Sequence, residues 1–500
     1  MQSEIDRLRN AARRLKKAYR AADDEALTRV AAYISDASVK HADFLHVIAC
    51  ENGFDSWPKL KFKLETQALS RAEKAEKLQY ALFVGQQWRV TQLLEETPDL
   101  ASENLALRVA TYDLNGVRAA IAARPAAATD RIGTRTPILH LAFSKYHKMA
   151  PEKRADMMAI AALLVANGAD VNDGYPAEGG APHLLSALYG ALGHADNVPL
   201  AEWLLDQGAT PDDSESLYHA TELGHHDGLK LLARHKANPY GTNALLRAID
   251  FNDPGMVRIL LEMGADPDEA AADHPSGQPV PKMPALHHAA RRWAGAEVAA
   301  VLLEHGADAS RSFDGHTAYA VARMHGNTAM AAYLSAQGHA SPLSPIAAAV
   351  AASAEGTPVP RLDPDALVRE DREILNRLSS HPDHLAQIRA LVTAGLDPHR
   401  ADRMKMTPLH QAAWCGFRDY VAYFLTLSPD LGAKNAYGGD VLSTTLHGAE
   451  NCPERAQQDH FACVQMLLEA GAPVDQRYVE ATGDERLAGL LADWLEGATS

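Results

Sequence analysis

Apolar residues recur along most of the chain in short groups whose spacing is typical of helices. In the stretch that begins at Asn243, Val257, Leu260 and Leu261 fall on one helical face. Gly264 follows, and glycine ends helices readily because it adopts the left-handed conformation that side chains with a β-carbon disfavour. The pattern therefore predicts short amphipathic helices. None of them can bury its apolar face alone, so each must stack on a neighbour.

This arrangement is repeated. A Leu-Leu pair that precedes Gly-Ala and then Asp, Thr or Pro occurs at residues 163–170, 204–210, 260–267, 302–308 and 467–473. A second motif, with a Thr-Pro-Leu-His start, an Ala-Ala pair and a glycine, is cleanest at residues 407–416. A chain of 500 residues is too long for one core, since single cores rarely exceed about 250–300 residues. The sequence therefore predicts a repeat array.

The repeated motif resembles the ankyrin repeat from about residue 76 to the end of the chain. Thr407 can cap a helix that has Pro408 in its first position, and Gly416 can end it. The resemblance implies a pair of antiparallel helices in each repeat and a β-hairpin finger that projects sideways. We therefore predict an all-α ankyrin-repeat solenoid with short β-hairpin fingers.

The chain divides into four parts. Residues 1–68 lack the repeat and predict a helical N-terminal domain, which resembles the segment that precedes the repeats in many bacterial ankyrin proteins. Residues 76–340 form the first array, and residues 384–500 form further repeats with a C-terminal cap at 484–496. Between them, residues 341–383 are an interrupted repeat with a Pro/Gly-rich insertion, and residues 366–378 predict an extra surface helix.

The N-terminal domain leaves one alternative function open. Phe54, Trp57 and Leu60 are expected to pack against the preceding helix and the first helix, which favours a capping role. Two short helices joined by a tight turn also describe a helix-turn-helix. A nucleic-acid-contacting N-terminal module tethered to a protein-binding array is therefore the alternative hypothesis.

Charge and cysteine content narrow the choice of partner and compartment. The net charge of −16 repels phosphate backbones, which makes nucleic acid a poor partner for the main body and a basic protein a better one. Four cysteines in 500 residues are not a disulfide framework, and the first residues have no apolar signal core. We predict a cytoplasmic monomer without a membrane span.

No known catalytic or cofactor motif is found in the sequence. Phosphate-binding loops, dinucleotide-binding glycines, nucleophile elbows and zinc-protease helices are all missing. Cys452, His460 and Cys463 are the nearest approach to a metal site, but their spacing is irregular and they lack a fourth ligand. The sequence therefore predicts no metal, no cofactor and no enzymatic activity.

A protein partner is expected to bind where the fingers depart from the repeat pattern. Solenoids use an extended concave face of finger tips and inner helices, and aromatic, Arg and Met side chains are enriched at binding surfaces. The candidate residues are Tyr175, His274, Lys282, Arg311, Phe313, Arg400, Arg403, Met404, Lys405 and Tyr437. The predicted function is a protein–protein interaction scaffold or adaptor, and an effector or toxin-neutralising protein is a variant of it.

Overall fold

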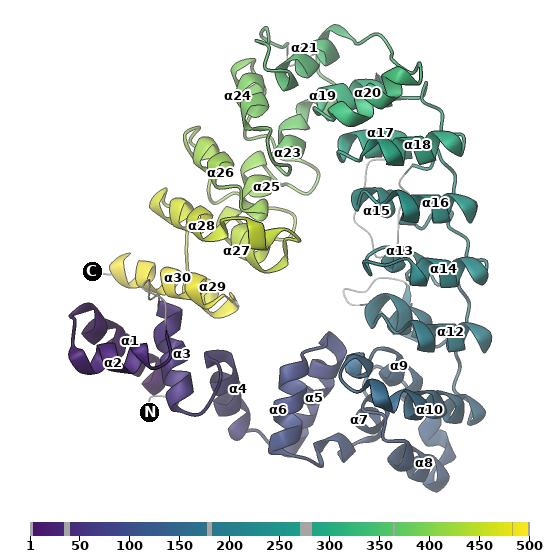
Figure 1. Cartoon of the computed structure of the whole chain (residues 1–500), viewed down its shortest axis with the longest axis vertical. Helices are drawn as coiled ribbons and strands as arrows, with labels where there is room; N and C mark the ends of the chain where they lie inside the picture. The colour runs from purple at the N-terminus through teal and green to yellow at the C-terminus, as the bar shows by residue number, and fades with distance from the viewer. Residues whose placement is uncertain are drawn as a thin grey trace.

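The computed structural model describes residues 4–34, 41–177, 183–270, 283–363, 366–482 and 484–498. Within these ranges, helices form nearly all of the regular structure, and most of them are arranged as antiparallel pairs that stack along a curved course (Figure 1). The predicted all-α solenoid is confirmed. Its short strands are confined to fingers between repeats.

The N-terminal domain has its own small core. Trp57 and Leu60 are buried there against Leu15 and Val47, as the sequence predicts. On the same helix, Lys59 and Lys61 are half-buried. The domain consists of α1 (Glu4–Arg20), α2 (Asp24–Ala31), α3 (His41–Glu51) and α4 (Trp57–Gln67).

The first array continues from α5 to α20. In the stack from α13 to α18, odd-numbered helices face the inside of the curve and even-numbered helices face the outside (Figure 1). The helices are α5 (Arg71–Val84), α6 (Gln87–Glu96), α7 (Leu105–Ala110), α8 (Leu114–Ala123), α9 (Pro137–Ala142), α10 (Arg154–Ala166), α11 (Ala187–Tyr189), α12 (Val198–Asp206), α13 (Ser216–Ala220), α14 (Asp227–Arg234), α15 (Ala244–Asp250), α16 (Pro254–Glu262), α17 (Ala285–Arg291), α18 (Ala296–Glu304), α19 (Ala318–Met324) and α20 (Thr328–Ala336).

Among the described residues, two fingers of the first array contain β-strands. In one, β1 (Gly174–Pro176) pairs antiparallel with β2 (Leu184–Ser186). In the other, β3 (Ser312–Phe313) pairs antiparallel with β4 (His316–Thr317). Each finger leads from an outer helix to the next inner helix, and Tyr175 of β1 packs into the core of the stack.

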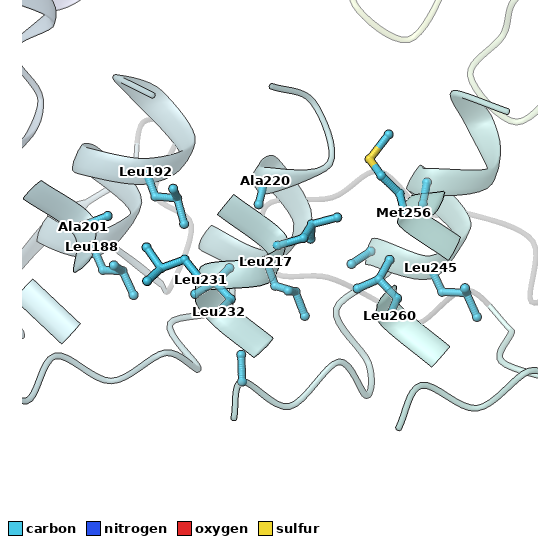
Figure 2. Packing of buried hydrophobic residues seen from close by; sticks show 14 of the residues in the cluster. Leu188, Leu192, Ala201, Leu217, Ala220, Leu231, Leu232, Leu245, Met256 and Leu260 are labelled. Carbon is cyan, nitrogen blue, oxygen red and sulfur yellow. The ribbon is translucent and has the colours of Figure 1, made fainter. Parts of the chain in front are cut away.

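The core runs continuously between repeats. Leu217, Leu231 and Leu260 are buried between adjacent helix pairs, and Figure 2 shows their side chains in one layer with those of Leu188 and Leu245. Their complete burial confirms the repeat register derived from the leucine and glycine positions. Because each pair covers the apolar face of the next, the array is stabilised by nearest-neighbour contacts.

The junction between the arrays differs from the sequence-based prediction. It contains α21 (Pro345–Ala354), α22 (Arg369–Arg372) and α23 (Ile374–Leu378). Residues 366–378 were expected to form a surface helix, but Ile374, Leu375 and Leu378 are buried in the second core. The helix α23 packs against the next two helices of the chain and takes the place of an inner helix. Because a long insertion separates α23 from α21, the apolar spacing of α23 could not be aligned with the repeat pattern.

Buried charges attach this junction to the first array. The Arg291 guanidinium on α17 lies 3.3 Å from the Glu370 carboxylate on α22. The His316 imidazole on β4 lies 2.8 Å from the Asp371 carboxylate, and both side chains are buried. A charge removed from water needs such a partner, since breaking a buried pair is strongly destabilising. These contacts fix the position of α22 against the fingers and inner helices of the first array.

The second array brings the chain back towards its beginning. It consists of α24 (Leu385–Thr393), α25 (Pro408–Cys415), α26 (Arg418–Leu425), α27 (Val441–Asn451), α28 (His460–Glu469), α29 (Gln476–Ala481) and α30 (Glu485–Ala498). The predicted capping helix at 484–496 corresponds to α30. This helix contacts α3 of the N-terminal domain, so the elements follow a closed, ring-like course (Figure 1).

Candidate partner-binding surface

The finger between α24 and α25 is a tight turn organised by one carboxylate. Asp402 Oδ1 accepts hydrogen bonds from the backbone N–H groups of Met404 at 2.8 Å and Met406 at 2.9 Å. The Asp402 N–H donates to the Met406 carbonyl at 2.9 Å and closes the turn. Lys405 has a φ of 54°, in the left-handed region. The turn therefore holds Met404 and Lys405 in a fixed backbone geometry.

The next finger, between α26 and α27, repeats this construction with an amide in place of the carboxylate. Asn435 Oδ1 accepts from the N–H groups of Tyr437 and Gly439, each at 3.0 Å. The Asn435 N–H donates to the Gly439 carbonyl at 2.8 Å. Tyr437 therefore occupies the same position in its turn as Met404 occupies in the preceding one.

A backbone hydrogen bond joins the two turns. The Ala436 N–H donates to the Met404 carbonyl at 2.8 Å. The Tyr437 side chain is 67% exposed, and Met404 is partly exposed. Two large apolar side chains of adjacent repeats therefore stand at equivalent positions on directly bonded turns.

Cations flank Met404 along the chain of this finger. Arg403 and Lys405 are exposed, and Arg400 is half-buried. Within the described part of the chain, no carboxylate forms a hydrogen bond or ion pair with any of the three. The Asp402 carboxylate is turned back onto its own turn, where backbone N–H groups occupy it. The positive charges of this finger therefore remain available to another molecule.

The inner helices of the first array also carry many charges, but these are paired with one another. The His219 imidazole on α13 lies 3.2 Å from Glu215 and 2.7 Å from Glu222. Burial alone would lower the pKa of His219, but its hydrogen bonds to Glu215 and Glu222 outweigh that effect and raise the pKa to about 9. His219 is thus held in its charged form at neutral pH.

The pairing continues along α15 and α17. The Arg247 guanidinium bonds Glu222 at 2.9 Å and lies 3.4 Å from Asp250. Asp250 is in turn 2.8 Å from both His288 and Arg292. Burial alone would raise the pKa of Asp250, but His288 and the two arginines lower it well below its usual range. We call the residues Glu215, His219, Glu222, Arg247, Asp250, His288 and Arg292 the inner charge ladder.

The structure changes the interpretation of Tyr175. The sequence predicts a partner-binding residue, but only 7% of its surface is exposed. Its ring lies 4.5 Å from the Arg135 guanidinium, and its hydroxyl accepts a hydrogen bond from Arg135 at 2.9 Å. Phe83 and Phe143 also lie against Arg135. Tyr175 is therefore part of an internal aromatic cluster that encloses a cation, which its position in a finger did not reveal.

The remaining predicted residues fall into two groups. Arg311 lies 3.7 Å from the Asp268 carboxylate of the preceding finger, and Phe313 on β3 is half-buried with its ring edge towards His287. His274 and Lys282 lie outside the described residues. Of the ten candidates, the structure brings Arg400, Arg403, Met404, Lys405 and Tyr437 together on adjoining turns.

An exposed aromatic residue of a finger was missed. Tyr240 is 75% exposed in the finger between α14 and α15, where its N–H donates to Asn238 Oδ1 at 3.1 Å. The sequence signal was present, since Asn238, Pro239, Tyr240 and Gly241 stand where the other repeats have their finger. The glycine-rich turn chemistry is the same as that around Tyr437.

The cysteine and histidine residues considered for a metal site each have a separate structural environment. His460 bonds the Trp414 carbonyl at 3.0 Å, Cys463 is fully buried in the second core, and Cys452 is buried as well. In the described ranges, no group of His, Cys, Asp or Glu side chains is arranged to hold a metal ion. Within the same ranges, no helix is long and apolar enough to span a bilayer.

The stacked helix pairs, the glycine-terminated helices and the hydrogen-bonded fingers define an ankyrin-repeat solenoid. Comparison with known proteins agrees: a family model described as ankyrin repeats (3 copies) matches residues 188–271. The chain is 37% identical over 100 residues to the palmitoyltransferase Hip14 of Drosophila melanogaster. It is also similar to the crystal structure of the human ASB11 ankyrin repeat domain, with 20% identity and a TM-score of 0.35, over 48% of this chain and 100% of that one.

The similarity to Hip14 is partial. It covers 20% of this chain and 14% of the length of Hip14. The predicted bacterial origin is not shown by these comparisons, since this relative is an insect protein.

The same relative contradicts one sequence-based prediction. The chain was predicted not to be an enzyme, but Hip14 is named as an enzyme and shares a segment of similar sequence. Ankyrin repeats and enzymatic activity therefore occur in one protein, and the lack of familiar catalytic motifs in this sequence is no ground for excluding an enzyme. The prediction is withdrawn.

Proposed function

We propose that the chain binds a protein partner through its fingers and the inner helices next to them. The observation that carries this proposal is the exposure of two finger tyrosines. Tyr240 and Tyr437 are the most exposed large apolar side chains among the described residues, at 75% and 67%. Tyrosine contributes a large, rigid contact area and a hydroxyl, which makes it a frequent anchor of protein interfaces.

The shape of the array supports the same proposal. A stack of repeats offers an extended surface on which several fingers contact one partner at once. A scaffold or adaptor that acts as a monomer in the cytoplasm remains our prediction for its setting. The four free cysteines are consistent with a reducing compartment.

The alternative, nucleic-acid contact by the N-terminal domain with α4 as the recognition helix, finds no support in the contacts of that helix. Its lysines on α4 are each paired with a carboxylate: Lys59 with Asp55, Lys61 with Glu65 at 3.6 Å and Lys63 with Glu96 at 3.1 Å. Trp57, Leu60 and Phe62 of the same helix are buried. A recognition helix needs free cations and polar side chains that reach the bases.

The proposal is tested by affinity capture followed by measurement with purified components. The full chain is immobilised, proteins retained from a lysate of its source organism are identified, and the Kd of each is measured by calorimetry. We expect at least one protein to bind the wild-type chain. The double variant Tyr240→Ala and Tyr437→Ala should bind it at least about tenfold more weakly, because alanine removes anchors of this size at a cost of about 2 kcal/mol or more.

Tyr33→Ala is the matched control. Tyr33 is 44% exposed in the N-terminal domain, outside the fingers, and its loss should leave the Kd unchanged. Equal weakening by Tyr33→Ala would place the interaction on the N-terminal domain. If no purified protein binds the wild-type chain, the proposed function is wrong.

A further inference from the structure

The two bonded fingers of the second array combine exposed cations with exposed apolar tips. We call Arg400, Arg403, Met404, Lys405 and Tyr437 the basic finger patch. We propose that this patch docks an acidic segment of a partner protein, in which Asp or Glu residues flank one bulky apolar side chain. This inference rests on the proposed function and specifies the chemistry of the partner at one surface.

Charge is the first argument. Arg403 and Lys405 are exposed, and within the described ranges neither is paired with a carboxylate. Elsewhere in the second array, the exposed Lys434 of the next finger lies 2.6 Å from Asp440, and Arg477 on α29 lies 2.6 Å from Asp475. The patch therefore keeps a local positive potential on a chain with a net charge of −16. Such a potential attracts carboxylates and orients them on approach.

The apolar tips are the second argument. Met404 is flexible and polarisable, so it adapts to apolar groups of different shapes. Tyr437 adds a rigid ring at the equivalent position of the adjacent turn. The 2.8 Å hydrogen bond from the Ala436 N–H to the Met404 carbonyl keeps the two turns side by side. An apolar side chain of the partner placed between them would lose exposed surface on both sides. Cations alone would give attraction without this anchor.

The rigidity of the turns is the third argument. The backbone N–H groups of Met404 and Tyr437 are held by Asp402 and Asn435 at 2.8 and 3.0 Å. A surface whose backbone is already ordered loses less conformational entropy when a ligand binds. The basic finger patch is therefore a pre-formed site for a short extended segment of a partner protein.

The patch fits a protein segment better than a nucleic acid. Nucleic-acid affinity depends on many phosphate contacts and on cations spread along a groove. Here there are three cations on a strongly acidic chain, which repels a long polyanion outside the patch. A short acidic segment meets the patch without extending over the acidic surroundings.

The test is a peptide selection on the purified full chain. A phage-displayed library of random peptides is selected on the wild type and on the double variant Arg403→Glu and Lys405→Glu. A control variant, Lys230→Glu and Lys236→Glu, makes the same charge change at two exposed lysines on and just beyond the outer helix α14. We expect wild-type and control selections to enrich acidic peptides with a bulky apolar residue.

Synthetic copies of the enriched peptides then give Kd values by fluorescence anisotropy. The Arg403→Glu and Lys405→Glu variant should bind them at least about tenfold more weakly, and Tyr437→Ala about three- to tenfold more weakly, with less than about twofold change in the control. Wild-type affinity should fall as sodium chloride is raised, because screening weakens exposed charge interactions.

Several results would overturn the inference. They are enrichment of neutral or basic peptides, no enrichment at all, or acidic peptides that bind the patch variant as tightly as the wild type. A labelled oligothymidine that binds the wild type more tightly than the peptides and is lost in the patch variant would assign the patch to nucleic acid. If a captured protein partner depends on Tyr240 and is indifferent to the patch variant, the proposed function stands and this inference falls.

Discussion

The two arrays have similar cores and handle their surface charges in opposite ways. On the inner helices of the first array, His219, Arg247 and Asp250 belong to a ladder in which each charge has an opposite neighbour within about one hydrogen-bond length. On the fingers of the second array, Arg403 and Lys405 have no such neighbour within the described residues. The first arrangement holds inner helices together, and the second leaves charge available to a partner.

This difference shows that net charge does not describe which charges of a repeat protein are free to meet a partner. The total of −16 suggested a basic partner, yet several carboxylates of the first array are already matched by His219 and by arginines. A charge that is satisfied inside the molecule gives little net attraction to an outside group. The proposed acidic partner segment therefore follows from the unpaired cations of the basic finger patch and not from the net charge.

The largest expected effect tests whether the cores are equivalent. Leu260→Ala in the first array and Leu467→Ala in the second should each destabilise the protein by about 2–5 kcal/mol, because both leucines are fully buried and alanine leaves a cavity. Urea unfolding followed by circular dichroism measures the change for the transition that contains the mutated repeat. A loss below about 0.5 kcal/mol at either site would mean that its array is not packed as described.

A smaller effect tests the ladder. Asp250→Asn keeps the shape of the side chain but removes the charge that faces Arg247, His288 and Arg292, so we expect a loss of about 1–3 kcal/mol. Asp227→Asn on an exposed position of α14 is the control and should change stability by less than about 0.5 kcal/mol. Equal effects of the two variants would contradict the role of the ladder.

The pH dependence of stability is a second test of the inner charge ladder. The folded-state pKa of His219 is about 9, above its unfolded value near 6.5. Its contribution is therefore fully present below about pH 6.5 and is lost as the pH rises through 9. We expect the free energy of unfolding of the wild type to fall by about 2–3 kcal/mol between these pH values relative to that of His219→Gln, and thermal unfolding at a series of pH values measures the difference. Parallel pH profiles for the two proteins would show that His219 is not held by Glu215 and Glu222.

The smallest effect is expected at the basic finger patch. Replacing Arg403 and Lys405 with alanine should change the free energy of unfolding by less than about 0.5 kcal/mol, since neither side chain supports the core or an ion pair. The measurement is the same urea titration. A loss above about 1 kcal/mol would mean that these cations have a structural role, and the contrast between the arrays would disappear.

The repeat register could be predicted from the sequence because it depends on local patterns. The Leu-Leu and glycine positions of residues 260–264 specify a buried face and a helix end, and both are found. Gly264 has a φ of 99°, which a residue with a side chain rarely adopts. The junction was harder to predict, because a long insertion separates α21 from α23. The burial of α23 also depends on contacts with the later helices α24 and α25.

The candidate surface could be predicted only in part. The positions of the fingers followed from the repeat, so Met404 and Tyr437 could be predicted. The turns closed by Asp402 and Asn435, which make these two positions equivalent, follow the same repeat. Tyr175 was misread because its burial depends on Arg135, forty residues earlier in the chain. The pairing of the ladder could not be predicted either, since each of its ion pairs between helices joins residues of different repeats.

The contact between α3 and α30 constrains how this protein can change in evolution. In an open array, a repeat can be duplicated or deleted, because each unit touches only its neighbours. Here every unit adds a small rotation, and the sum must bring the last helix to the N-terminal domain. A gain or loss of one repeat would leave the two ends out of register. We therefore expect related chains that keep this contact to vary in their loops and fingers while they preserve the number of repeats.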